Sequence, residues 1–224
     1  MTPIASYLDL ANHHANSTHS DIKKVCLLTL KHKFNSVFVN PYYVSFAHQL
    51  LNNQAKIGTV VSFPLGQDTL DIKLAATKHA LTAGADELDI SLNVGLLKQA
   101  KWDQALDEMK ALVSTIKEKS QTKIAKFILE TGHLTDSEIT KTSQLILESE
   151  ADFIKTNSGM GPRGAIIKDV EVIKQAIGNQ IKIKVAGGIH TYNQAIAFIK
   201  AGASRIGTSR AVQIVNQSNS SVSG

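Results

Sequence analysis

Two lysines occupy apolar, strand-like segments where a protein core rarely holds a charge. Lys155 ends the segment 152–155, and Lys184 alternates with Ile183 and Val185. A buried ammonium group is costly unless it is paired or gives up its proton. A lysine that has lost its proton is a nucleophile for aldehydes and ketones. These positions therefore predict amine chemistry on a carbonyl substrate.

Mutual perturbation would make one of these lysines reactive at neutral pH. At an ordinary pKa of about 10.4, about 0.04% of a lysine amine is neutral at pH 7. Desolvation and a second ammonium group both lower that pKa, and a decrease of about three units corresponds to about 4 kcal/mol. Lys155 and Lys184 are expected on neighbouring strands, where each can perturb the other. The pattern does not say which one is the nucleophile.

The elements that must position these lysines alternate regularly along the chain. Short segments of strand-like composition alternate eight times with segments of helical period. We expect strands at 4–10, 36–40, 56–62, 87–91, 123–130, 152–157, 182–187 and 205–209. Helices are expected near 18–33, 41–53, 69–83, 98–119, 135–150, 166–178, 191–201 and 210–217. This series predicts an α/β fold, a closed (β/α)₈ barrel, because an open doubly wound sheet usually has fewer strands and a glycine-rich turn after the first.

Local signals support these boundaries and a single domain. Thr18, Thr135 and Thr191 each precede an expected helix and have an Asp, Glu or Gln three residues later, which is the spacing of a capping box. No linker or change of composition interrupts residues 1–215, so we expect one catalytic barrel domain there. The segment 216–224 is rich in serine and poor in apolar residues, and it is expected to be a disordered tail.

Alternation within the strands predicts which side chains enter the barrel lumen. The apolar residues of each strand must pack against helices, so the polar residues between them point inward. Near the carboxyl ends of the strands, where barrel enzymes place catalytic groups, this parity brings together Lys126, Lys155, Lys184 and Asp89. Asp89 could transfer protons for the carbonyl chemistry. An alternative interpretation is that the lysines only form buried ion pairs with Asp89, Glu87 or Glu130.

Two loops near the end of the chain have the composition of an anion site. Gly187-Gly188 follows the seventh expected strand and Thr208-Ser209 ends the eighth, each just before a helix. Backbone N–H groups, hydroxyls and helix N-termini bind anions in such loops, and this is the common phosphate position of the barrel. Gly159 could close a third side. A single Gly-Gly pair is usually only turn geometry, but two such loops predict a phosphate site.

Composition limits the remaining classes of function. The formal charge of +5 comes from scattered basic residues, so we expect no nucleic acid. This charge suits an anionic small-molecule substrate, but it is more often only a solvated surface of mixed charge. There is no signal-peptide pattern and no long apolar segment, so we expect a cytoplasmic protein without membrane contact. The single cysteine, Cys26, excludes an internal disulfide. No pair among the eight histidines has the His-x-x-x-His spacing, and neither a metal nor another cofactor is expected.

Two motifs together resemble the class I deoxyribose-phosphate aldolases, which are Schiff-base lyases. They are the segments 152–159 and 182–189, with further matches at 36–41, 84–89, 128–131 and 205–209, all within residues 4–212. The resemblance implies reversible cleavage of the phosphosugar 2-deoxy-D-ribose 5-phosphate to the aldehydes D-glyceraldehyde 3-phosphate and acetaldehyde. It implies that Lys155 forms the imine, Lys184 perturbs it and Asp89 transfers protons, with Lys126 and Asp9 in supporting positions. A homodimer is compatible with the resemblance.

Several positions differ from the usual pattern of this family. The segment 10–15 replaces a threonine-containing stretch, Met160 stands where relatives carry an aromatic residue or lysine, and Arg210 adds a cation beside the phosphate loop. The terminal tyrosine seen in many members is missing, which predicts slower turnover. Two alternative functions would use the same barrel and loops: a phosphosugar isomerase with a carboxylate base, and a non-catalytic phosphosugar-binding barrel.

Overall fold

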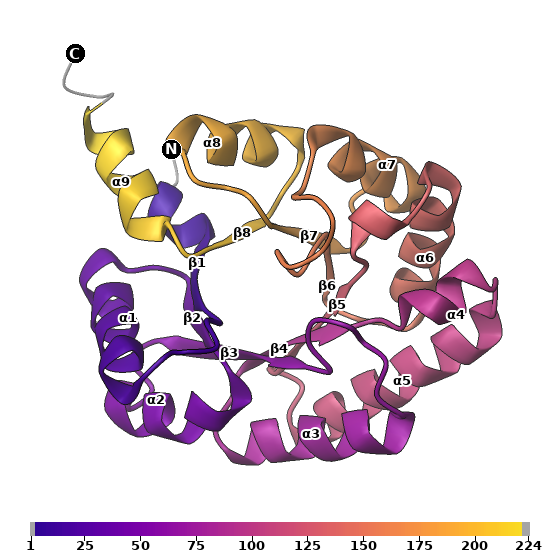
Figure 1. Ribbon diagram of the computed structural model, residues 1–224, viewed down its shortest axis with the longest axis horizontal. Helices are drawn as coiled ribbons and strands as arrows, with labels where there is room; N and C mark the ends of the chain where they lie inside the picture. Colours follow the sequence, from indigo (N-terminus) through magenta and orange to yellow (C-terminus); the bar gives the residue numbers. More distant parts are fainter. Residues whose placement is uncertain (1–2, 221–224) are drawn as a thin grey trace.

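Eight parallel strands form a closed barrel in the computed structural model, which describes residues 3–220 (Figure 1). The strands follow one another around the barrel in sequence order, and the eighth pairs with the first. They are β1 (Leu8–Asn12), β2 (Ser36–Val39), β3 (Lys56–Val61), β4 (Glu87–Ser91), β5 (Ile124–Ile128), β6 (Phe153–Lys155), β7 (Lys182–Ala186) and β8 (Arg205–Thr208). The predicted α/β fold, a closed (β/α)₈ barrel, is confirmed.

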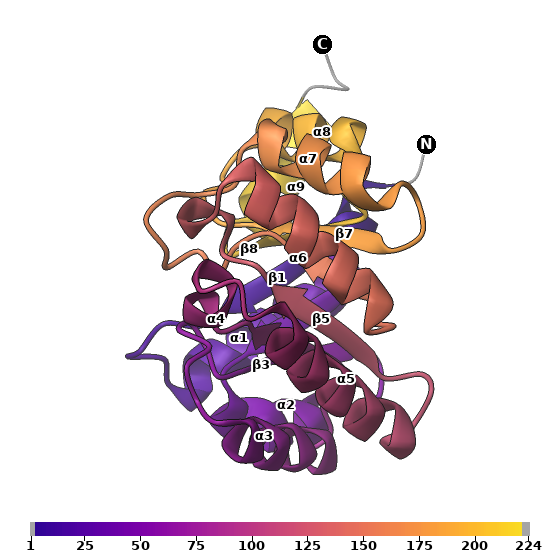
Figure 2. The ribbon, with the colours of Figure 1, turned by 90° about the vertical axis from the view of Figure 1, so that its right-hand side faces the viewer.

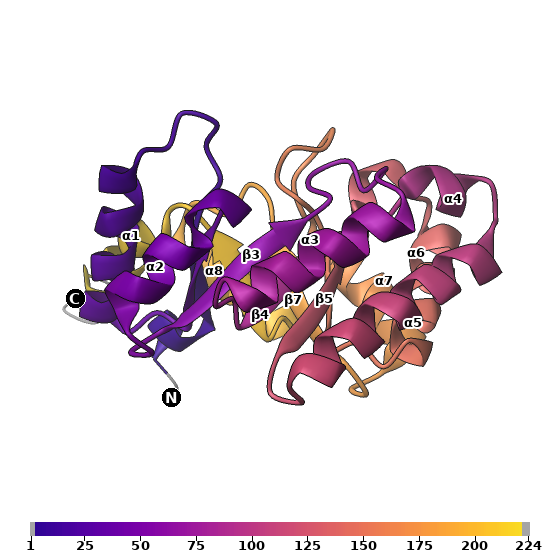
Figure 3. The same ribbon diagram turned by 90° about the horizontal axis from the view of Figure 1, so that it is seen from below.

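Helices form a layer around the outside of the strands, as the views from the side and from below also show (Figure 2, Figure 3). They are α1 (His19–His32), α2 (Val44–Leu51), α3 (Leu70–Thr82), α4 (Val94–Lys98), α5 (Trp102–Lys119), α6 (Asp136–Glu148), α7 (Ile167–Ile177), α8 (Tyr192–Ala201) and α9 (Ala211–Ser220). Within residues 3–220, no helix has the length and apolar character that crossing a membrane requires.

Strand alternation divides the buried side chains into two groups, as the sequence pattern predicts. Leu88, Ile154 and Ile183 belong to the apolar core between strands and helices. Phe38 and Phe153 are equally buried but stand outside that core, on the lumen side, where they contact the charged ends of inward-facing lysines. Because the outward-facing residues form the apolar core, the inward positions of β4 to β7 can hold charged side chains without interrupting it.

Capping interactions begin the helices at the predicted residues. Thr18, Thr135 and Thr191 each form a capping box, in which the threonine side chain accepts from the third helical N–H and the side chain at that position accepts from the threonine N–H. These reciprocal bonds satisfy two N–H groups that the first helical turn leaves free. They explain why the helix starts were readable from sequence alone.

The structure differs from the expected elements in three places. Residues Ile4–Tyr7 form a 3₁₀ helix after Pro3, so β1 begins at Leu8 and not at residue 4. The short helix α4 was not expected as a separate element; it begins where the Asn93 side chain accepts from the N–H of Leu96. The last helix continues to Ser220, past its expected end near residue 217 and into the segment 216–224 that was expected to be a disordered tail; residues 221–224 lie outside the described residues.

The longer last helix has a local cause. The side-chain oxygen of Gln217 accepts a 2.8 Å hydrogen bond from the N–H of Tyr192, at the beginning of α8. Ser218 Oγ also donates to the carbonyl of Val215, one turn earlier. Gln217, which composition assigns to a tail, therefore joins α9 to α8, and Ser218 adds a bond within α9.

Candidate active site

Three lysines enter the lumen from three consecutive strands. Lys126 of β5, Lys155 of β6 and Lys184 of β7 are 0%, 4% and 1% exposed, and strand register places Lys155 directly beside Lys184. Asp89, from β4, lies among them: its Oδ2 is 2.7 Å from Lys155 Nζ and 2.9 Å from Lys184 Nζ. The four side chains that the sequence predicts to converge therefore lie together in the lumen.

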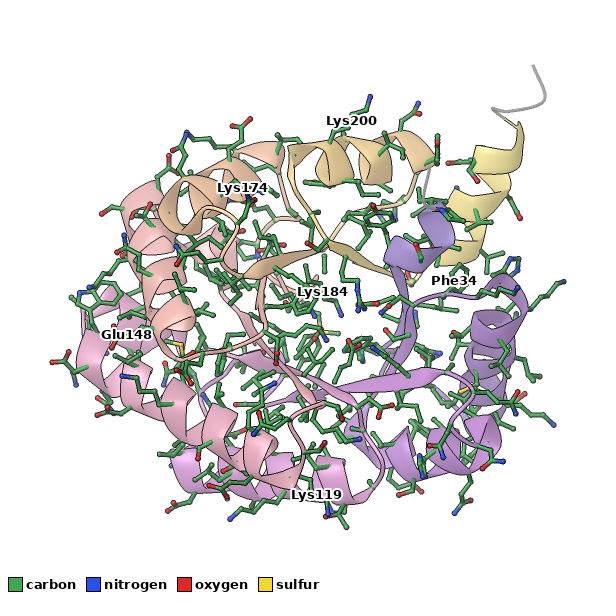
Figure 4. All side chains as sticks on the ribbon, turned by 180° about the vertical axis from the view of Figure 1, so that it is seen from behind. Phe34, Lys119, Glu148, Lys174, Lys184 and Lys200 are labelled. Carbon is green, nitrogen blue, oxygen red and sulfur yellow. The ribbon has the colours of Figure 1, made fainter. Side chains whose placement is uncertain are left out.

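Lys184 lies inside the ring of strands, whereas Lys119 and Lys200 lie on the outer helices and are exposed (Figure 4). Its Nζ is 3.3 Å from the centroid of the Phe38 ring. A desolvated ammonium over an aromatic face gains electrostatic stabilisation, so Phe38 is a favourable neighbour for the Lys184 side chain. The sequence analysis did not select Phe38, although the same strand parity could have placed it in the lumen.

Asp9, the first supporting residue, lies within β1 and is fully buried. Its Oδ2 is 2.9 Å from Lys184 Nζ, and its Oδ1 is 3.1 Å from the guanidinium of Arg205 on β8. Ser36 Oγ and Asn35 Nδ2 donate to the same Oδ1 over 2.7 and 2.9 Å. Asp9 therefore connects Lys184 on β7 to side chains of β8 and β2.

Lys126, the second supporting residue, lies in a different environment from the other two lysines. Its Nζ contacts Glu87 Oε2 at 2.5 Å and Asp89 Oδ1 at 3.3 Å. Burial alone would lower the pKa of Lys126, but Glu87, Asp89 and Asp9 outweigh burial and raise it above its ordinary value. Lys126 does not line the cavity that reaches Lys155. It is a charged member of the surrounding network and not a second nucleophile.

The connected network contains more positive than negative groups. Lys126, Lys155, Lys184 and Arg205 are paired with the three carboxylates of Asp9, Glu87 and Asp89. With every group ionised, four cations face three anions and leave an excess of one positive charge. Loss of one proton from a lysine balances the charges, which lowers the cost of burying the network.

The pKa shifts indicate which lysine loses that proton. Burial lowers the pKa of Lys155; Asp89 opposes this, while the ammonium groups of Lys184 and Lys126 add to it, and the net direction is downward. Burial would raise the pKa of Asp89, but Lys155, Lys184 and Lys126 hold it well below its ordinary range. The pKa of Asp9 is lowered too, since Lys184, Lys126 and Arg205 outweigh its burial. Both carboxylates are therefore ionised at neutral pH.

A cavity of about 350 Å³ connects Lys155, Lys184 and Asp89 to the carboxyl-end loops of the barrel. The five residues predicted for phosphate binding all line it, and they are Gly159, Gly187, Gly188, Thr208 and Ser209. Gly187 and Gly188 have φ of 97° and 76°, a conformation that glycine adopts without strain. A larger hollow of about 560 Å³ lies at the opposite ends of β2 to β5 and reaches none of the three lysines.

Thr208 and Ser209 differ in what they can offer to a ligand. Thr208 Oγ1 donates to the carbonyl of Ile189 over 2.7 Å and accepts from the N–H of Arg210 over 2.9 Å. Its hydroxyl therefore joins the β7 and β8 loops, whereas Ser209 is exposed at the cavity wall. Arg210 lines a separate groove beside α1 and α9, so this cation is not part of the cavity.

His13 is a cavity residue that the sequence analysis did not select. It lies in the loop after β1, its Nδ1 is 3.2 Å from Asn40 Oδ1, and its ring centroid is 5.4 Å from that of Phe63. Burial lowers the pKa of His13, Lys155 lowers it further, and the result is about 4. His13 is therefore neutral at pH 7. The unusual composition of segment 10–15 marked this loop, but only the fold places His13 beside Lys155.

No arrangement of three or more His, Cys, Asp or Glu suited to a metal ion occurs among residues 3–220. The carboxylates that converge in the lumen are occupied by lysine and arginine side chains. What the arrangement can do is amine chemistry: it presents a buried lysine of lowered pKa, a neighbouring cation and an ionised carboxylate at the base of an open cavity.

The family model described as DeoC/LacD family aldolase matches residues 4–212. A deoxyribose-phosphate aldolase of Caldicellulosiruptor saccharolyticus is 41% identical over 215 residues, which are 96% of this chain and 97% of that protein. One of Streptococcus uberis is 42% identical over 214 residues, 95% of this chain and 96% of that protein.

Solved structures agree with these sequence comparisons. A structure described as QR15, an aldolase, has a TM-score of 0.92 and 33% identity, covering 98% of this chain and 97% of that one. A structure described as a tetrameric deoxyribose phosphate aldolase from Aeropyrum pernix has a TM-score of 0.90 and 26% identity, covering 97% and 91%. The chain belongs to the DeoC/LacD family of aldolases and is a carbon–carbon lyase built on a (β/α)₈ barrel.

Proposed function

We propose that the protein cleaves 2-deoxy-D-ribose 5-phosphate reversibly to D-glyceraldehyde 3-phosphate and acetaldehyde, through an imine on Lys155. The observation that carries the proposal is a buried amine of lowered pKa at the base of a cavity whose other end is made of glycine loops. The names of the curated relatives support the choice of substrate. An isomerase or a binding protein would not need the paired lysines.

Lys155 is the better nucleophile of the two cavity lysines because it has the weaker anionic environment. Its ammonium pairs with one carboxylate, that of Asp89, which is shared with two other lysines. Lys184 pairs with both Asp89 and Asp9 and lies over the Phe38 ring. Each of these contacts stabilises a charged amine, so Lys184 stays the cation and Lys155 becomes the neutral amine.

The reaction follows from this division of labour. The neutral Nζ of Lys155 adds to C1 of the open-chain sugar, and loss of water gives a protonated imine. The imine accepts the electron pair of the C2–C3 bond as the C3 hydroxyl passes its proton to the ionised Asp89, and D-glyceraldehyde 3-phosphate leaves. The remaining enamine takes a proton on carbon, and water releases acetaldehyde. Asp89 is ionised and lies 2.7 Å from Lys155 Nζ, so it accepts and returns the protons exchanged at this nitrogen.

The loops hold the other end of the substrate. A phosphate on C5 fits the wall formed by Gly159, Gly187 and Gly188, where backbone N–H groups can approach an anion closely. Anchoring at this end leaves the aldehyde carbon directed toward Lys155, at the base of the same cavity. Binding energy at a remote phosphate can in this way be used to orient the reacting carbon.

Reductive trapping tests the covalent step. Borohydride added with acetaldehyde is expected to leave an N-ethyl group on Lys155, because reduction fixes the imine, and peptide mass mapping locates it. The Lys155→Ala protein should melt as a folded domain, carry no adduct in the lumen and lose retro-aldol activity. An adduct on Lys184 would reverse the assignment of the two lysines, and cleavage without any adduct would remove the imine mechanism.

The pH–rate profile tests the perturbing role of Lys184. Removing this cation in Lys184→Met eliminates one cause of the lowered Lys155 pKa and leaves Asp89 freer to pair with Lys155. The pKa of Lys155 should therefore rise, so the limb of kcat/KM that increases with pH moves to higher pH and the rate at pH 7 falls about 100-fold. A loss of rate with the limb in its original place would contradict this role.

The protonation of His13 tests the electrostatic environment of the cavity. NMR titration should show a midpoint near pH 4 for this imidazole, assigned by the signal lost in His13→Asn. Lys155→Met should raise the midpoint, because Lys155 contributes to the lowering. The native pKa of His13 lies below the ordinary 6.5, so protonation of the unfolded chain reduces the free energy of unfolding as the pH falls from about 6.5 to 4. In His13→Asn the free energy of unfolding should decrease less over this pH range. A midpoint near 6.5 would contradict the burial of His13 beside Lys155.

A further inference from the structure

The segment 158–166, between β6 and α7, forms one wall of the cavity without regular secondary structure. Its first three residues, Ser158, Gly159 and Met160, line the cavity, whereas Arg163 does not. A loop that must hold backbone N–H groups at fixed positions needs attachment from outside the cavity.

Arg163 and Asp169 make the strongest of the contacts that attach this segment. Nη1 and Nη2 of Arg163 donate to Oδ2 and Oδ1 of Asp169 over 2.7 and 2.8 Å, which is a bidentate pair. Arg163 also donates to the carbonyls of Gly164 and Thr131, over 3.0 and 3.3 Å. Asp169 is buried in the first turn of α7 and lies 2.8 Å from the hydroxyl of Thr131. The pair therefore joins the segment both to α7 and to the turn after β5.

The same segment packs directly on the glycine turn after β7. The N–H of Ala165 donates to the carbonyl of Gly187 over 3.1 Å. A Cβ placed on Gly164 would lie 2.8 Å from that carbonyl oxygen, and one on Gly159 would lie 3.7 Å from the Gly187 Cα. The two loops are therefore in backbone contact. Any displacement of the segment 158–166 moves the wall against which Gly187 and Gly188 stand.

We propose that the Arg163–Asp169 pair is a positioning device that sets the shape of the phosphate subsite from outside the cavity. This inference rests on the proposed function for the identity of the bound group. The pair acts through Gly164 and Ala165 on the Gly187-Gly188 turn, and through the backbone on Ser158 and Gly159. Neither member of the pair touches the substrate.

Charge and position make opposite predictions for Asp169. Long-range electrostatics would weaken phosphate binding when the cation of Arg163 is removed, and strengthen it when the anion of Asp169 is removed. Loss of the positioning contact weakens binding in both cases. The sign of the Asp169→Asn effect therefore separates the two explanations.

The experiment compares Arg163→Met, Arg163→Lys and Asp169→Asn with the control Lys168→Met. Lys168 is an exposed residue of α7, and Lys168→Met removes the same charge as Arg163→Met. The ion-pair partner of Lys168 is Asp136, at 3.6 Å, and neither residue belongs to the segment 158–166. Arg163→Met and Asp169→Asn should each raise KM for 2-deoxyribose 5-phosphate about 10-fold more than KM for 2-deoxyribose, with kcat affected less. Arg163→Lys keeps the charge and loses the bidentate geometry, so it should change KM in the same direction. The control should match the wild-type protein.

Calorimetric titration with inorganic phosphate gives a readout that does not depend on catalysis. Both Arg163→Met and Asp169→Asn should weaken phosphate binding, with thermal melting used to verify folding. Opposite effects of the two variants, or equal effects on phosphorylated and unphosphorylated sugar, would overturn the inference. If Asp169→Asn does not fold, unchanged phosphate binding in Arg163→Lys would overturn it equally. The two proposals can fail separately. If the wild-type protein cleaves no deoxyribose phosphate but the variants still bind phosphate more weakly, the inference is supported and the proposed function is refuted.

Discussion

Compensation among buried charges is the constraint on which the rest of this structure depends. Each lumen lysine is almost fully buried and must find a carboxylate there, and removing one partner from a buried pair typically costs about 3–5 kcal/mol. Asp89 contacts all three lysines at 2.7 to 3.3 Å, and Asp9 and Glu87 complete the network. Because these side chains come from different strands, they meet only in a closed barrel.

The network compensates its charges unevenly, and this unevenness is what makes it chemically useful. Glu87 helps to raise the pKa of Lys126, and Lys184 contacts two carboxylates and an aromatic ring. Lys155 receives only part of one carboxylate and faces the open cavity. The least compensated lysine is therefore one of the two that line the cavity. Stability and reactivity have the same electrostatic origin in this lumen.

The residues that the sequence analysis identified as departures from the family pattern lie at the edge of the site and outside its charged centre. His13 occupies the altered loop after β1 as a neutral side chain, and Met160 is exposed at the cavity wall. Arg210 lies outside the cavity altogether. None of these three residues belongs to the network of lumen charges. The Arg163–Asp169 pair likewise lies outside the cavity.

Much of the fold and of the candidate active site follows from local pattern. Strand parity placed Lys126, Lys155, Lys184 and Asp89 in one lumen, because alternation requires only that the apolar face pack outward. Capping boxes marked three helix starts, because both members of each box lie within four residues. The glycine loops could be read because their position follows from the order of the βα units.

Tertiary structure decided what depends on closure and on side-chain packing. Asp9 and Lys184 are 175 positions apart and meet because β8 closes on β1. Contacts between residues far apart in the chain also give Lys155 and Lys184 unequal partners and place His13 beside Lys155. Side-chain packing likewise pairs Arg163 with Asp169. A sequence specifies which face of a strand a residue occupies, but not which distant side chain it meets, because that depends on how all eight strands register at once.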